Sequence, residues 1–326
     1  MLKIQTKFTS KLISSFVPSW SFKSFASVNG TIGLINKSPR DVALRAACTQ
    51  LLLTRWALES SHKSLPKTET PDSRGIEAFN TLKKTIDATQ IHKFMTAREK
   101  SLFEKEYGTW DVVEDLIPVE SRWESFGMLL WALRIFRDLP DFYSRFPNED
   151  MYKATAIIPA FPHTIDSFIE YFSSGEGVKP DHFVSQKEFG EAINVAEAWY
   201  WRSRSQIVMD LKTSLADGSP ESEQAKKKLP PGLKNVMENI EQAISLATDR
   251  ALADKLITKA SKNDFAVFDG IPYSEMDDHS MRDVAVIAEN RLAALGWLTG
   301  SHEWEYVRGE LTFINPMGSL FSPEEE

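Results

Sequence analysis

The chain of 326 residues contains a single cysteine, Cys48. One cysteine excludes a disulfide within the chain and leaves no Cys-x-x-Cys pair for zinc, which favours a reducing compartment. Free cysteine behaves as a small apolar side chain when it is buried. We therefore interpret Cys48 as a residue on the apolar face of a helix.

Glycine is also scarce, with 15 residues against nine tryptophans and 20 phenylalanines. Sandwiches and barrels usually need more turn glycines, so this balance favours helices that pack through bulky side chains. No apolar run approaches the roughly 20 residues that a membrane-spanning helix needs. We predict an all-α fold, a single multi-helix domain with minor short extended segments, and no membrane span.

The familiar catalytic and cofactor motifs are missing. The histidines never pair at the spacing of one helical turn, and the sequence has no His-Glu-x-x-His motif. It also lacks a Gly-x-Ser-x-Gly elbow and both common phosphate-binding glycine loops. Asp277, Asp278 and His279 are adjacent, and we interpret them as the acidic start of a final helix. The sequence therefore predicts no cofactor and no metal site.

Acidic residues are missing from the first forty positions, although the whole chain has a net charge of −8. The negative total disfavours nucleic acid as a partner. The acid-free start is rich in serine and alternates basic and apolar residues, namely Lys3, Lys7 and Lys11 with Phe8, Leu12 and Phe16. This pattern is typical of an organelle transit peptide, so mitochondrial import is expected. The alternative is a cytoplasmic protein with a disordered basic arm.

Composition along the chain suggests a simple organisation. We expect a disordered basic leader over 1–38, a helical domain over 39–312 and a disordered acidic tail over 313–326. Residues 214–234 combine a Gly-Ser-Pro turn signal, three consecutive lysines and a Pro-Pro pair. We predict a flexible insertion there.

The stretch from Arg122 to Phe136 is apolar on nearly every side, interrupted after its first turn only by Gly127 and Arg134. A helix of this kind belongs at the centre of a bundle, because any exposed face would leave large apolar side chains in water. We expect the other helices to surround it.

Several charged residues lie inside apolar helical patterns: Arg122, Glu124, Glu197, Arg202, Arg204 and Arg291. Arg291 is the clearest, because it shares one helical face with Val284, Ile287 and Leu298. A buried guanidinium needs a carboxylate partner to offset its desolvation. We predict that Arg291 pairs with Glu124 or Glu197.

These residues allow two functional hypotheses. In the favoured one, they form a buried polar network in a non-catalytic protein that binds another protein or a small polar ligand. In the alternative, they line the cleft of a hydrolase or transferase, with Glu124 or Glu197 as acid or base and Arg291 holding an anion. A network would be sealed from water, whereas a cleft would be open.

Two tryptophan motifs carry a family resemblance. The run Arg122-Trp123-Glu124 followed by Leu129-Leu130-Trp131-Ala132-Leu133, and the terminal run from Arg291-Leu292 through Trp297-Leu298 to Trp304, resemble a mostly bacterial domain-of-unknown-function family, number 4272 in its series. The similarity extends over roughly Arg45 to Val307. It departs at Ser121, Asn290, Gly296 and Glu305, where the family pattern has other residues. The resemblance implies a helical fold and no particular reaction.

Overall fold

A computed structural model describes residues 34–65, 72–157, 162–307, 309 and 311. Its contacts gather into two compact units. The first unit comprises the described residues of Leu34–Phe189 and Ala293–Glu305, and the second comprises Gly190–Leu292 and the few described residues from Tyr306 onward. The expected leader and tail fall almost entirely outside the described residues, so the predicted domain boundaries stay a prediction.

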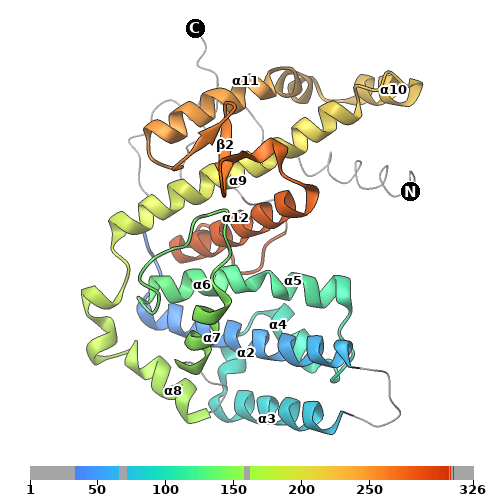
Figure 1. Cartoon of the computed structure of the whole chain (residues 1–326). Helices are drawn as coiled ribbons and strands as arrows, with labels where there is room; N and C mark the ends of the chain where they lie inside the picture. The colour runs from blue at the N-terminus through green and yellow to red at the C-terminus, as the bar shows by residue number, and fades with distance from the viewer. Residues whose placement is uncertain (1–33, 66–71, 158–161, 308, 310, 312–326) are drawn as a thin grey trace. The chain divides into compact units, whose positions relative to one another are not determined.

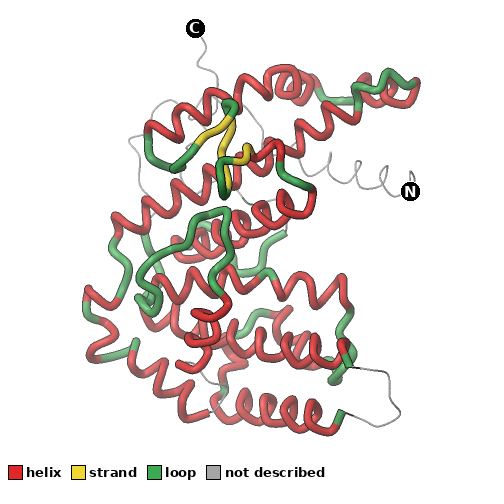
Figure 2. Tube along the Cα trace, in the orientation of Figure 1, coloured by secondary structure: helices red, strands yellow, loops and turns green. Residues whose placement is uncertain are grey.

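The described chain is predominantly helical, as predicted, and its strands form one small sheet (Figures 1 and 2). The helices of the first unit are α2 (Pro39–Ser64), α3 (Ser73–Thr89), η1 (Ile91–Phe94), α4 (Ala97–Glu104), η2 (Val112–Leu116), α5 (Ile117–Glu120), α6 (Arg122–Ala132), α7 (Asn148–Ile157), α8 (Pro162–Tyr171), η3 (Gly175–Val178) and η4 (Pro180–His182). Two long helices, α9 (Gln186–Ser214) and α12 (Asp278–Thr299), contribute to both units. The second unit also holds α10 (Pro220–Lys228), α11 (Pro231–Ala253), β1 (Ala260–Ser261), β2 (Asp264–Val267), β3 (Ile271–Pro272) and η5 (Tyr273–Glu275). No described helix is long and apolar enough to cross a membrane.

Helix α2 forms the core of the first unit. The Ser38 hydroxyl caps its start by accepting a hydrogen bond from the Asp41 amide, and the Asp41 carboxylate accepts one from the Ser38 amide. This reciprocal cap and Pro39 in the first turn fix where the helix begins. Helix α2 packs against α3, α4, α5, α6 and α8. Cys48 is fully buried on it, and burial raises the pKa of its thiol to about 12. The interpretation of Cys48 as a core residue is confirmed.

Helix α6 is buried from Glu124 to Ala132, as its all-round apolar sequence predicts. It ends at Ala132, however, and the prediction of a helix continuing to Phe136 is wrong. The chain turns because Arg134 adopts a left-handed conformation, with φ +56°. An α-helix cannot continue through a residue in that region.

The core of the second unit lies between α9 and α11. It is made by Trp201, Val208 and Leu215 from α9 and the end of that helix, and by Met237, Ile240, Ile244 and Ala247 from α11. The α11 positions recur at three- and four-residue spacing and the α9 positions at seven-residue spacing, so each helix presents one apolar stripe to the other. Leu229, which follows α10, is buried in the same cluster.

Helix α10 occupies Pro220–Lys228 inside the predicted flexible insertion over 214–234, so this part of the insertion is helical, and its flexibility stays a prediction. Ser219 caps this helix by accepting a hydrogen bond from the Ser222 amide at 3.1 Å. Glu221 and Glu223 lie in the first turn and the three lysines lie in the last turn. This charge order favours a helix, because acids stabilise the N-terminus and bases the C-terminus. The lysine run is therefore a helix end.

A three-stranded antiparallel sheet in the order β1-β2-β3 precedes α12. Ala260 pairs with Phe265, and Val267 pairs with Ile271. All four residues of β2 are buried, which places Asp264 in the interior. At the start of α12, Asp277 accepts hydrogen bonds from the amides of His279 and Ser280 at 2.9 and 3.0 Å. The interpretation of Asp277 to His279 as an acidic helix start is confirmed.

Candidate functional site

The predicted polar network is shielded from water. Glu197, Arg202 and Arg291 are 0 % exposed, and Glu124 is 4 % exposed. The helical phase that placed Arg291 on the apolar face of α12 is therefore correct. Its pairing with Glu124 or Glu197 stays a prediction. Neither Glu124 nor Glu197 is exposed on the surface of the described chain.

Arg202 has a partner that the sequence analysis did not assign. Its Nε and Nη2 atoms donate to the two carboxylate oxygens of Asp264, at 2.5 and 2.7 Å. The guanidinium also lies 4.4 Å from the centre of the Tyr273 ring. A two-point contact of this kind is the strongest form of arginine pairing. It fastens α9 to β2 within the second unit.

Asp264 is well suited to this role. It also accepts hydrogen bonds from the amides of Phe265 and Ser274, at 2.7 and 3.0 Å. Burial acts to raise the pKa of its carboxyl, but the hydrogen bonds and the charge of Arg202 outweigh burial, so the pKa is lowered. The carboxylate thus stays ionised inside the protein.

Arg122 and Arg204 complete the predicted set. Arg122 lies at the start of α6, where its Nη1 donates to the Trp304 carbonyl and its Nη2 to Glu305 at 2.8 Å. Glu305 also accepts from the Thr96 hydroxyl at 2.8 Å. Arg204 is half-buried, and its guanidinium lies against Gly309. A side chain at Gly309 would collide with it.

Two further buried arginines on α2 escaped the sequence analysis. Arg45 donates to both carboxylate oxygens of Glu99 at 2.6 Å. Arg55 lies 2.5 Å from Glu59, and both side chains are fully buried. A sequence signal existed for Arg55 and Glu59, because their four-residue spacing continues the apolar stripe of Leu51 and Leu52. Embedded ion pairs are thus a general means of fixing helices in this protein.

Accessible charged groups gather elsewhere, beyond the end of α6. The backbone amide of Arg134 donates to the Trp131 carbonyl, and the amide of Ile135 donates to the Leu130 carbonyl, each at 2.9 Å. This pattern is the Schellman turn, which normally has glycine at the left-handed position. An arginine there is disfavoured by roughly 1 kcal/mol. The same turn ends α11, where Lys255 is the left-handed residue with φ +59°.

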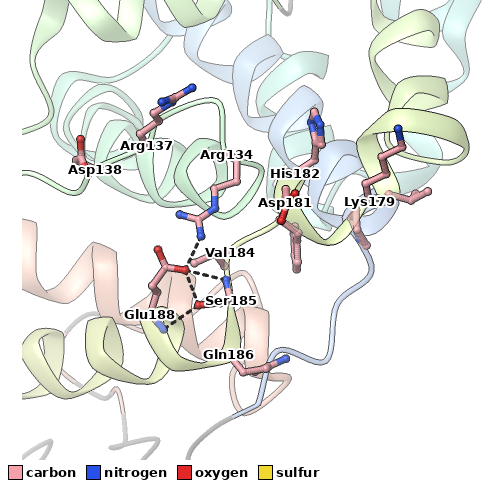
Figure 3. A pocket seen from close by; sticks show the side chains of 13 residues that line it. Arg134, Arg137, Asp138, Lys179, Asp181, His182, Val184, Ser185, Gln186 and Glu188 are labelled. Carbon is pink, nitrogen blue, oxygen red and sulfur yellow. Dashed lines mark hydrogen bonds and ion pairs between the residues drawn. The ribbon is translucent and has the colours of Figure 1, made fainter.

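The Arg134 side chain reaches the start of α9. Its guanidinium contacts the carboxylate of Glu188, which also accepts from the hydroxyl and the amide of Ser185 (Figure 3). Ser185 in turn accepts from the Glu188 amide, so the two residues form a capping box. The hydrogen bond from Arg134 is the main reason that the pKa of the Glu188 carboxyl falls to about 2.

This pair lies in a groove of about 980 Å³ within the first unit. The groove is lined by Pro39, Arg134, Arg137, Asp138, Val178, Lys179, Asp181, His182, Phe183, Val184, Ser185, Gln186 and Glu188. Arg134, Arg137 and Asp138 come from the turn after α6, and Lys179, Asp181 and His182 come from the segment across the groove (Figure 3). The Val184 amide donates to the Ala132 carbonyl at 2.9 Å, which ties the two sides together.

Both signs of charge are available in this groove. Arg137, Asp138 and Asp181 are exposed, and they make no ion pair or side-chain hydrogen bond with any described residue. Arg137 projects away from the Arg134–Glu188 pair rather than joining it (Figure 3). No sequence motif marks these residues. Only the turn at Arg134 brings them opposite the segment at Lys179 to Glu188.

No protein-family model matches the chain, and comparisons with curated proteins and with solved structures gave no match either. The resemblance to the domain-of-unknown-function family therefore stays a prediction. Among the described residues, no three metal-ligating side chains gather where they could hold an ion. The groove is the candidate site that the geometry itself defines.

Proposed function

We propose that this protein is a non-catalytic binding protein whose groove at Arg134 holds a short peptide segment or a small polar ligand. The observation that carries the proposal is that the charged residues fall into two groups, one buried and one accessible from solvent. Glu124, Glu197, Arg202 and Arg291 are buried in the helices, whereas the charged residues of the groove are accessible and include charges without a partner among the described residues. Ligand sites need accessible polar groups on a preorganised frame.

The alternative, an enzyme with an embedded Glu/Arg site, has less support. It requires Glu124 and Glu197 to reach a substrate, and both carboxylates are buried. A general acid or base must approach the atom whose proton it transfers to within hydrogen-bonding distance. Cys48 is unsuited to be a nucleophile, because its thiol stays protonated near neutral pH.

The charges of the groove define the class of ligand. Arg137 on one side suits a carboxylate, and Asp138 and Asp181 suit an ammonium or guanidinium group. A volume of about 980 Å³ has room for a peptide of a few residues. We therefore expect a ligand that carries both signs of charge, as amino acids and charged peptides do.

A matched peptide library tests this function. Di- to tetrapeptides with both signs of charge should raise the melting temperature of the full chain, because a ligand that binds only the folded state stabilises it. Length-matched uncharged peptides should have no effect. Arg137→Ala should remove the shift. Arg74→Ala should keep it, because Arg74 is exposed on α3 and lies outside the groove.

Two outcomes would contradict the proposal. One is a library in which no charged peptide stabilises the protein, and the other is a shift that survives in Arg137→Ala. Mass spectrometry of small molecules that co-purify with the protein provides an independent measurement. A bound molecule should be present with the wild type and with Arg74→Ala, and absent with Arg137→Ala.

We also propose import into mitochondria, from the acid-free basic start of the sequence alone. The first 33 residues lie outside the described part of the chain. The first residue of the protein recovered from cells, together with its compartment, tests this proposal. Recovery of the complete chain from the cytoplasm would instead favour the basic-arm alternative.

A further inference from the structure

An exposed apolar surface lies on η2 and the first residue of α5, within the first unit. Val112, Val113 and Ile117 are 50, 65 and 47 % exposed. The Ile117 amide donates to the Val112 carbonyl, five residues back, so this turn is π-helical. The wider turn brings Val112 and Ile117 to the same side, and Val113 lies one α-turn from Ile117. We call these three residues the Val113 surface.

The backbone beneath the Val113 surface is held from several sides. Asp111 caps the turn by accepting from the amides of Val113 and Glu114 at 2.8 and 2.9 Å. Pro118 has no amide hydrogen to give the Glu114 carbonyl, and Arg98 donates to that carbonyl at 3.1 Å instead. Buried Asp115 accepts from Lys105 at 2.5 Å. The apolar side chains are thus presented on a preorganised frame, which lowers the entropic cost of binding.

Acidic groups border the same surface, together with the exposed Arg98, whose guanidinium lies on the Glu114 carbonyl. Glu114 and Glu120 are exposed, and neither carboxylate pairs with a described residue. Two copies of this surface would bring like charges together, which opposes self-association. The acids also disfavour an anionic lipid surface. Apolar residues rimmed by unpaired carboxylates instead match a helix with one apolar face and basic flanks.

We propose that the Val113 surface docks a basic amphipathic helix of a partner protein. Val112, Val113 and Ile117 would cover the apolar face of that helix, and Glu114 and Glu120 would pair with its lysines or arginines. The surface is separate in residues from the groove at Arg134, so this proposal does not depend on the proposed function.

A fluorescent Lys/Leu peptide of helical periodicity, titrated with the full chain, tests the proposal by anisotropy. Binding should weaken strongly between 50 and 500 mM salt, because screening removes the charge attraction. Val113→Ser with Ile117→Ser should weaken it about tenfold without changing the net charge. The matched control is Ile76→Ser, an exposed apolar residue of α3, which should leave binding unchanged.

A second pair of double variants tests the acidic rim. Glu114→Gln with Glu120→Gln should weaken binding. Glu77→Gln with Glu104→Gln removes the same number of negative charges and should leave binding unchanged. Equal losses in the two double variants would show non-specific attraction and overturn the proposal. Equal binding of a Glu/Leu peptide would also overturn it. Two other results would overturn the proposal. One is self-association in sedimentation that the double variant Val113→Ser with Ile117→Ser abolishes, and the other is binding of the protein to phosphatidylglycerol vesicles.

Discussion

At the scale of single residues, this protein depends on arginines held inside helices by carboxylates. The pair of Arg202 and Asp264 shows the principle, because the two side chains make two short contacts and are nearly excluded from water. The attraction offsets the cost of removing both charges from water only while both partners are present. The pair therefore specifies which element packs on α9 more than it adds stability.

Removing one member of this pair should be costly. Arg202→Met should lower the free energy of unfolding by about 3–5 kcal/mol, because it leaves Asp264 buried without its cation. Adding Asp264→Asn should recover part of the loss, since a neutral amide needs no counter-charge. Urea unfolding measures both effects. Arg282→Met at an exposed position is the control, and its free energy of unfolding should change by less than about 0.5 kcal/mol. An equally small loss in Arg202→Met would contradict the prediction.

Arg134 offers a second test at this scale. Arg134→Gly and Arg134→Ala both remove the ion pair with Glu188, but only glycine adopts a positive φ without strain. We expect Arg134→Gly to be more stable than Arg134→Ala by about 1 kcal/mol in urea unfolding. Equal stabilities would mean that the left-handed conformation at residue 134 carries no strain.

At the scale of elements, helix ends decide where the groove lies. Helix α9 begins at the capping box of Ser185 and Glu188, and α6 ends at the turn of Arg134. The Arg134–Glu188 contact joins the two ends. The carboxylate of Glu188 therefore serves a helix cap and an ion pair together.

This double role predicts a pH dependence. Because the pKa of Glu188 is lowered to about 2, its contribution to stability is complete above about pH 4.5 and declines as the pH falls toward 2. The stability difference between wild type and Glu188→Gln should shrink over that range. The side chain is 42 % exposed, so the difference at neutral pH should not exceed about 1 kcal/mol. A difference that stays constant from pH 6 to 3 would contradict the assignment.

At the scale of the whole molecule, the chain forms two compact units that share helices α9 and α12. Each unit has its own apolar core and its own buried ion pairs, with Arg202 and Asp264 in one and Arg45 and Glu99 in the other. Units with separate cores can unfold in separate steps.

Calorimetry should distinguish the units. We expect two overlapping unfolding transitions. Arg202→Met should lower the midpoint temperature of one, and Arg45→Met should lower the midpoint temperature of the other. The two variants act as controls for each other, because each removes a buried guanidinium from a different core. A single transition that both variants shift equally would show that the shared helices make unfolding cooperative across the chain.

Several features were predictable because their causes are local. The scarcity of glycine and the helical spacing of apolar residues predicted the fold class, and spacing alone predicted the burial of Arg291 on α12. The sequence from Thr96 to Glu99 has the spacing of a capping box, and the structure contains that cap at the start of α4. The helix α10 was missed although Ser219 and the charges that follow it signal a helix, because proline and glycine beside them suggested a loop.

The sequence by itself determined that this is a helical protein with buried charges, since periodicity and composition act along a few turns of chain. Only the tertiary structure decided which carboxylate meets Arg202, because Asp264 lies 62 residues away along the chain. The same holds for the groove. A left-handed arginine has no signature in sequence, because surrounding contacts impose it against the local preference of the backbone. This turn brings Arg137 and Asp138 opposite the segment that leads into α9.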